Sequence, residues 1–79
     1  MRAKFSKGPK LALRILVPKA IYKKAVDRNL LKRRIREATR MWYDKLPVGS
    51  YTIYCEPGLL RLKFNDIKHL LHNSLRTFL

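Results

Sequence analysis

Hydrophobic residues recur with a helical period in two stretches of this chain. The first runs from near Lys23 or Asp27 to about Lys45, and its apolar residues follow at spacings of four, three and four: Leu31, Ile35, Ala38 and Trp42. The second begins near Asn65, and its apolar residues continue to the C-terminal end: Phe64, Ile67, Leu71, Leu75 and Phe78. These spacings place each set on one face of a helix. Two amphipathic helices, each with one buried face, are therefore predicted.

Two shorter segments alternate between apolar and polar side chains, which is the pattern of a half-buried strand. Residues 11–17 form the first segment, and Pro18 ends it because proline has no N–H group for a sheet hydrogen bond. Residues 50–56 form the second, with three residues on its buried face: Tyr51, Ile53 and Cys55. Residues 46–49 and Pro57-Gly58 supply the turns on either side of this second strand.

The predicted order of elements is strand, helix, strand, helix. This order indicates an α+β fold with one small sheet and helices packed on it. Residues 11–79 are predicted to form a single domain. Residues 1–10 carry four basic side chains and a Gly8-Pro9 break, and they are predicted to be a flexible or loosely docked basic arm.

The net charge of +14 indicates an anionic partner. Nineteen Lys and Arg stand against five Asp and Glu in 79 residues, so the chain repels itself unless something negative neutralises it. Nucleic acid is the first expectation and an anionic membrane surface the second. No apolar run approaches the ~18 residues of a spanning helix, so the chain is not predicted to cross a membrane. The predicted partner is nucleic acid and not a membrane.

The N-terminal residues and the cysteine content bear on the compartment. Arg14 interrupts the only early apolar run, which argues against a signal peptide. An organelle transit peptide is the alternative, because no acidic residue precedes Asp27, but the region is Lys-rich and alternates like a strand. The single cysteine, Cys55, has no disulfide partner within the chain and suits the reducing cytoplasm, which is the predicted location.

The first predicted helix is also the most basic part of the chain, with eight Lys or Arg among residues 23–40. Four of them recur at every fourth residue and form a stripe apart from the apolar face: Arg28, Lys32, Arg36 and Arg40. Asn29 and Arg33 lie alongside this stripe. Guanidinium groups pair bidentately with phosphate oxygens, and lysines add point charge. One face of this helix is therefore predicted to pack on a core and the other to bind a polyanion.

The remaining reactive side chains make no recognisable catalytic or metal site. Asp27 and Glu37 are ten residues apart on one helix, about 15 Å along its axis, too far to act as acid and base on one bond. Glu37 is expected to pair with arginines of its own helix. His69 and His72 lack further ligands for zinc, and Cys55 is expected to be a buried strand residue. No catalytic residue and no metal site are predicted in the protein.

The aromatic residues divide into two groups. Trp42, Phe64 and Phe78 fall on the apolar stripes and are expected to pack in the core. Tyr22 and Tyr54 lie off those stripes and are candidates for stacking on unpaired bases.

Residues 17–40 resemble the signature of the bacterial ribonuclease P protein component. In that family a strand ends in a Lys-containing connection, and a helix follows with Arg-Asn, Lys-Arg, Arg-Glu and a final Arg, each separated by two residues. The matching residues here are Arg28-Asn29, Lys32-Arg33, Arg36-Glu37 and Arg40, preceded by Lys19, Lys24 and Ala25. The later strand, Pro57-Gly58 and the terminal helix also follow the family's order, so the resemblance covers residues 11–79.

The resemblance implies the protein subunit of ribonuclease P, an endoribonuclease whose RNA subunit uses Mg²⁺ to remove the 5′ leader from precursor tRNA. The protein would bind the catalytic RNA, help to hold the precursor and promote metal binding. It would act as a monomer in a 1:1 ribonucleoprotein, with no cofactor of its own. The implied RNA-binding residues are Lys19, Lys24, Arg28, Asn29, Lys32, Arg33, Arg36 and Arg40. The implied fold is ribosomal S5 domain 2-like, with a left-handed βαβ crossover that is an exception to the usual hand.

The chain departs from the family's pattern in two places. It is a short form at its N-terminus, where family members usually carry a helix and additional strand sequence, including aromatic residues that line a cleft for the single-stranded leader. A sheet with fewer strands is therefore expected. Thr39 stands where an aromatic residue is common. Whether the short form binds the leader is therefore open at this stage.

Two other functions compete with this reading. One is a ribosomal or general RNA-binding protein of similar fold with no role in tRNA 5′ processing. The other is a DNA-binding module that places the basic helix in a major groove. A helix-turn-helix joins its two helices by a short turn, whereas a strand separates the two helices predicted here.

Overall fold

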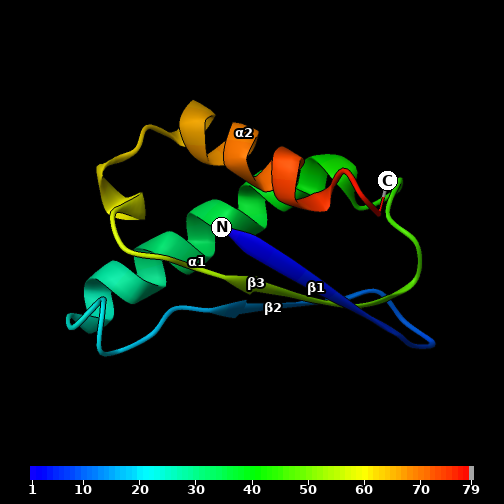
Figure 1. Cartoon of the computed structure of the whole chain (residues 1–79), viewed down its shortest axis with the longest axis horizontal. Coiled ribbons are helices and arrows are strands. Elements are labelled where there is room, and N and C mark those ends of the chain that lie inside the picture. The colour runs from blue at the N-terminus through cyan, green and yellow to red at the C-terminus, as the bar shows by residue number, and fades with distance from the viewer. Residues whose placement is uncertain (79) are drawn as a thin grey trace.

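Three strands and two α-helices make up the computed structural model, which describes residues 1–78 (Figure 1). The elements follow in the order β1 (Arg2–Lys7), β2 (Ala12–Leu16), α1 (Ala25–Thr39), β3 (Gly49–Tyr54) and α2 (Phe64–Leu75), with 3-10 turns at Arg40–Trp42 and Leu59–Arg61. The predicted α+β class, with helices packed on a small sheet, is confirmed. The predicted order of elements is incomplete, because strand β1 precedes the four elements that were expected.

Strand β1 corrects the prediction that residues 1–10 are a flexible arm. It pairs antiparallel with β3, while β2 pairs parallel with the other side of β3, so the sheet order is β1-β3-β2. In this register Ala3 lies opposite Ile53, and Phe5 lies opposite Tyr51. The Phe5 and Tyr51 rings are 4.9 Å apart between centroids, and Phe78 packs against both. The first strand is therefore part of the sheet, and its Ala3 side chain packs against the core.

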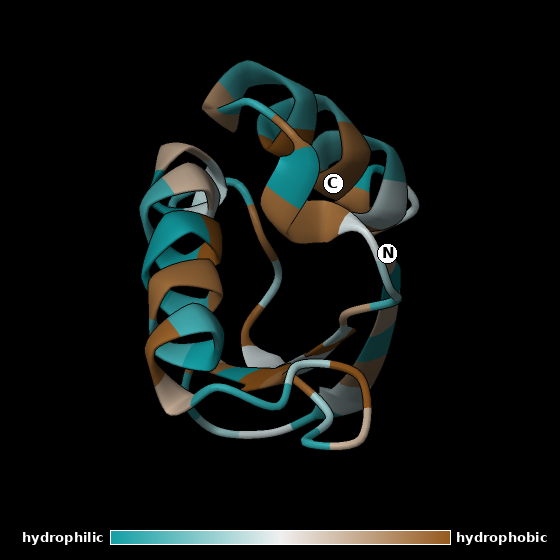
Figure 2. Ribbon diagram, turned by 90° about the vertical axis from the view of Figure 1, so that its left-hand side faces the viewer, coloured by the Kyte–Doolittle hydropathy of each residue, from teal (hydrophilic) through white to brown (hydrophobic). Residues whose placement is uncertain are grey.

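Both helices cover the same face of the sheet, and the opposite face is left open (Figure 2). The alternation predicted for β3 is confirmed, because Tyr51, Ile53 and Cys55 are all buried. The helical stripes are confirmed at their centres by further buried residues: Leu31, Ile35 and Ala38 in α1, and Ile67, Leu71 and Leu75 in α2. The two ends of the stripes are more open, since Phe64 is 39% exposed and Trp42 is half-buried.

Helix α1 ends earlier than its sequence pattern suggests. The prediction placed its end near Lys45, but α-helical geometry stops at Thr39 and tightens into the 3-10 turn Arg40–Trp42. Thr39 is fully buried, and its hydroxyl donates a hydrogen bond of 2.7 Å to the Ile35 carbonyl. This bond satisfies the one buried hydroxyl of α1 within the helix itself.

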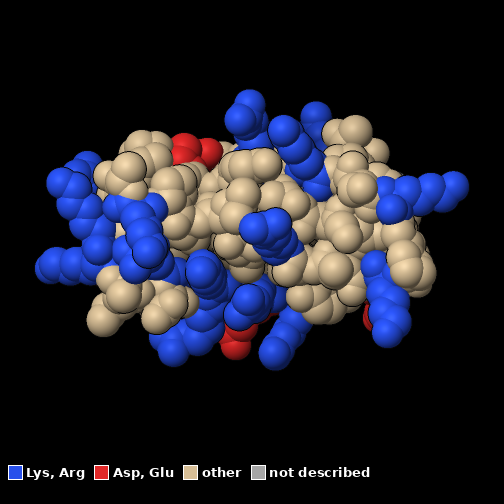
Figure 3. All heavy atoms as spheres, turned by 90° about the horizontal axis from the view of Figure 1, so that it is seen from below, with Lys and Arg blue, Asp and Glu red and all other residues tan. Residues whose placement is uncertain are grey.

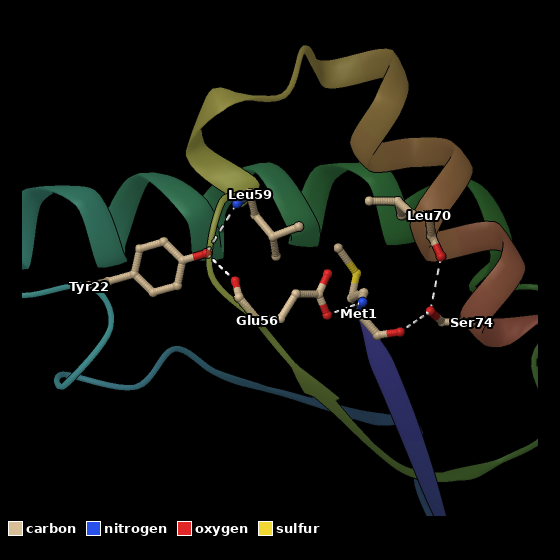
Figure 4. A network of polar contacts seen from close by, with 6 residues as sticks. All are labelled: Met1, Tyr22, Glu56, Leu59, Leu70 and Ser74. Atoms are coloured by element: carbon tan, nitrogen blue, oxygen red, sulfur yellow. Dashed lines mark hydrogen bonds and ion pairs between the residues drawn. The ribbon is translucent and has the colours of Figure 1, made fainter.

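Met1, the residue just before β1, is held from two sides (Figure 4). The Met1 ammonium pairs with the Glu56 carboxylate, which follows β3. The Met1 carbonyl accepts a hydrogen bond of 2.8 Å from the Ser74 hydroxyl of α2. These contacts join the start of the edge strand to the central strand and to the last helix.

Tyr22 is also part of this framework, and its predicted role in base stacking is wrong. Its side chain is buried, and its hydroxyl donates to the Glu56 carbonyl and accepts a hydrogen bond of 3.2 Å from the Leu59 N–H (Figure 4). Burial raises the pKa of the Tyr22 hydroxyl above its ordinary value, so the group keeps the proton that it donates to the Glu56 carbonyl. The residue fastens the β2–α1 connection to the chain that follows β3.

Replacing Tyr22 with phenylalanine is expected to lower the free energy of unfolding by about 1–3 kcal/mol, because two backbone groups lose their partner. Urea denaturation followed by circular dichroism measures the change. Tyr43→Phe is the matched control, since the Tyr43 hydroxyl makes no hydrogen bond within residues 1–78. Equal stability of the two variants would contradict the role assigned to the Tyr22 hydroxyl.

Candidate nucleic-acid interface

The cationic stripe of α1 turns from the flank of the core toward the open side of the helix. Successive residues of an α-helix are about 100° apart, so residues four positions apart are offset by about 40°. Accordingly, Arg28 and Lys32 are half-buried, while Arg36 and Arg40 are exposed. The first two side chains are thus partly covered by the protein, and the last two are open to solvent.

A shallow groove lies on the outer face of α1, beside the stripe. Val26, Asn29, Leu30 and Arg33 line it, and its volume is about 300 Å³. Val26 is 75% exposed, so the floor of the groove is apolar surface open to solvent. An apolar floor flanked by an amide and a guanidinium suits a sugar or base next to bound phosphates. The structure thus brings Asn29 and Arg33 together, as the helical spacing predicted.

The Arg28 guanidinium already forms hydrogen bonds within the protein. Its Nη1 atom donates to the Tyr22 carbonyl at 2.8 Å and to the Lys23 carbonyl at 3.0 Å. The helix begins without a side-chain cap at Lys24, and these bonds tie the preceding connection to the first turn of α1. Arg28 therefore has a positioning role that its place in the stripe did not reveal.

Lys19 and Lys24 add positive charge where α1 begins. Both are exposed, Lys19 in the connection after β2 and Lys24 at the helix N-cap. Figure 3 looks onto the open face of the sheet, and its Lys and Arg side chains gather toward the end of the molecule where α1 begins. The eight predicted residues thus lie in the connection that leads into α1, along α1 itself and, for Arg40, at the start of the 3-10 turn that follows it.

Carboxylates do not neutralise this surface. The only ion pair within residues 1–78 joins the Met1 ammonium to Glu56. The expected pairing of Glu37 with arginines of its own helix is not formed there. Apart from Arg28, whose guanidinium also bonds two backbone carbonyls, the guanidinium and ammonium groups of α1 are therefore available to pair with an external anion.

A second basic surface lies on the open face of the sheet. Arg2 and Lys4 of β1 approach the ring of Tyr54, at 5.8 Å and 5.4 Å from its centroid. Arg14 of β2 lies beside Thr52 in the parallel register, on the same face. An aromatic ring among cations is a typical contact for single-stranded nucleic acid. Sequence reasoning selected Tyr54 but missed the cations, which come from strands far apart in the chain.

The remaining reactive groups lie outside these surfaces. Burial raises the pKa of the Cys55 thiol to about 11, so it is protonated at neutral pH and a poor nucleophile. Among residues 1–78, no three His, Cys, Asp or Glu side chains are placed to hold a metal ion together. Within the same residues, neither helix has the length and apolar character needed to cross a membrane.

The comparison with protein families agrees with this geometry. A family model described as Ribonuclease P matches residues 1–79, which is the whole printed sequence. The match therefore includes strand β1 as well as the basic helix that first indicated the family. Members of this family bind RNA and take part in tRNA processing. The chain belongs to the ribonuclease P protein family.

Proposed function

We propose that this chain is the protein subunit of a ribonuclease P ribonucleoprotein, in which it binds the catalytic RNA and assists 5′-leader removal from precursor tRNA. The observation that supports the proposal best is the exposed, unneutralised face of α1 in a member of this family. We expect one protein per catalytic RNA, in the cytoplasm.

The cations of α1 suit a phosphate backbone in spacing as well as in charge. Residues four positions apart rise by about 6 Å along a helix, so the stripe from Arg28 to Arg40 spans about 18 Å. Each guanidinium offers a fork of N–H donors that matches a phosphate. The RNA-binding set we propose is Lys19, Lys24, Arg28, Asn29, Lys32, Arg33, Arg36 and Arg40.

The catalytic step is assigned to the RNA. Asp27 and Glu37, the two carboxylates of α1, are separated by ten residues of helix and cannot act on one bond. The Mg²⁺ ions of the reaction would be held by the RNA in the assembled particle. The part of the protein is to position the RNA and the precursor and to lower the repulsion between their phosphates.

The open sheet face is the surface we propose for the single-stranded leader. Tyr54 can stack on an unpaired base, while Arg2 and Lys4 neutralise its phosphates. The proposal is supported by β1, which supplies two of the cations on this face. The contact would help to hold the substrate without reading its sequence.

Reconstitution with a catalytic RNA tests the function. The protein alone is expected to leave precursor tRNA intact, and the protein added to the RNA at low magnesium is expected to raise the rate of 5′-leader removal. Gel analysis of the released leader measures both. Tight binding to the catalytic RNA with no stimulation would favour the competing function, a general RNA-binding protein of similar fold.

A further inference from the structure

A pocket between the end of α1 and helix α2 is not used by the surfaces described above. Its volume is about 300 Å³, and it is lined by Trp42, Asn65, Lys68, His69 and His72. We call it the Trp42 pocket. Trp42 packs against the core, as the sequence pattern predicted, but its indole is only half-buried and also forms a wall of this pocket.

The aromatic part of the pocket is a stack of two flat rings. The centroids of Trp42 and His72 are 5.4 Å apart, and the planes of the two rings differ by 29°. His72 is exposed, so the stack can be extended by a third flat group. Trp42 comes from the 3-10 turn after α1, and His72 comes from α2, so both elements hold the stack in place.

The polar part of the pocket suits a nucleotide. Asn65 offers an amide that both donates and accepts, and His69 offers ring nitrogens, which are the groups that read base edges. The Lys68 ammonium lies 5.8 Å from the Phe64 ring centroid and supplies a charge for a phosphate. None of the residues lining the pocket is acidic.

From these observations we infer that the Trp42 pocket binds one unpaired nucleobase of an RNA partner. The base stacks against the Trp42–His72 pair, its edge is held by Asn65 or His69, and its phosphate lies near Lys68. This inference rests on the proposed function only in taking the anionic partner to be RNA. The molecule measures only 34 × 22 × 16 Å, so a large RNA that contacts α1 has room to reach α2 as well.

Trp42 is the single tryptophan of the chain, so its fluorescence reports on this pocket alone. The probes are two labelled single-stranded oligonucleotides of the same length and charge, one with bases and one abasic. Label anisotropy measures binding anywhere on the protein, and indole fluorescence measures occupancy of the pocket. Both probes are expected to raise the anisotropy, but only the probe with bases is expected to quench Trp42.

The double variant Asn65→Ala/His72→Ala removes exposed side chains, and it is expected to weaken binding of the probe with bases by about 5- to 100-fold. Binding of the abasic probe should stay unchanged. Asn73→Ala is the matched control, because Asn73 is exposed on α2 and does not line the pocket.

Three results would overturn the inference. Binding by anisotropy without selective quenching would leave the proposed function standing and exclude the pocket. If neither probe bound the protein, both the proposed function and the assignment of the pocket would be contradicted. Stronger quenching by a poly-glutamate peptide than by the oligonucleotide would assign the pocket to an acidic protein segment.

Discussion

Replacing Arg33 and Arg36 with alanine is expected to weaken binding of the catalytic RNA by about a hundredfold, roughly tenfold for each side chain. Both guanidiniums are exposed on α1, and neither forms an ion pair or a side-chain hydrogen bond within residues 1–78. Each lost phosphate contact should also lower the slope of log affinity against log salt by about 0.7–0.9. Filter binding at several salt concentrations measures both effects, and leader removal at low magnesium should fall in parallel.

Arg28 is a poor choice for this experiment, although it belongs to the same stripe. Its bonds to the Tyr22 and Lys23 carbonyls mean that alanine would disturb the start of α1 as well as the RNA contact.

The matched control for the Arg33 and Arg36 pair is Lys45→Ala with Arg76→Ala. These two exposed cations lie off the stripe, and their loss changes the net charge equally. Equal weakening by the two pairs would show that net charge, and not the α1 surface, determines the affinity.

Replacing Gly49 with alanine is expected to lower the free energy of unfolding by about 2–4 kcal/mol. Gly49 begins β3 with φ at +153°, a conformation that side chains rarely adopt. An added Cβ would lie 2.7 Å from Cζ of Phe5 and 2.8 Å from the Ser6 carbonyl oxygen. Both neighbours belong to β1, so relief of the clash requires the edge strand to move away from β3.

Urea denaturation measures the loss of stability, and hydrogen exchange of the β1 amides locates it. Gly8→Ala is the control, because a Cβ at Gly8 would meet its nearest neighbour at an ordinary 3.8 Å. In a chain that already carries Phe5→Ala, Gly49→Ala should cost less stability than it does in the original chain, because the ring that the new Cβ would meet has been removed. Equal stability of the Gly49 and Gly8 variants would contradict the close packing of β1 on β3.

The sequence was most informative where buried residues recur within one element. Helix α1 was predicted from the spacing of Leu31, Ile35 and Ala38, and β3 from the alternation around Ile53, because these patterns are local. Strand β1 carries only a short, weakly apolar version of this pattern. Ala3 and Phe5 alternate with basic and polar residues, and the pairing partner of the strand lies more than forty positions along the chain.

The candidate site divides in the same way. The stripe of α1 follows from helical spacing, so its exposed members were predicted from the sequence. The hydrogen bonds of the Arg28 guanidinium and of the Tyr22 hydroxyl depend on how the β2–α1 connection folds in three dimensions, which residue spacing does not predict. The cations around Tyr54 come from β1, and only the antiparallel register places them beside that ring.

The central position of β3 has a consequence for how the chain acquires its fold. Every pairing in the sheet involves β3, and both outer strands precede it in the sequence. During synthesis, β1 and β2 therefore have no sheet partner until residues 49–54 have left the ribosome, whereas α1 can already form from local contacts. Met1 is the last of these residues to gain its contacts, because its partners Glu56 and Ser74 are synthesised after β3. Sheet assembly therefore cannot begin before the middle strand, β3, has been synthesised.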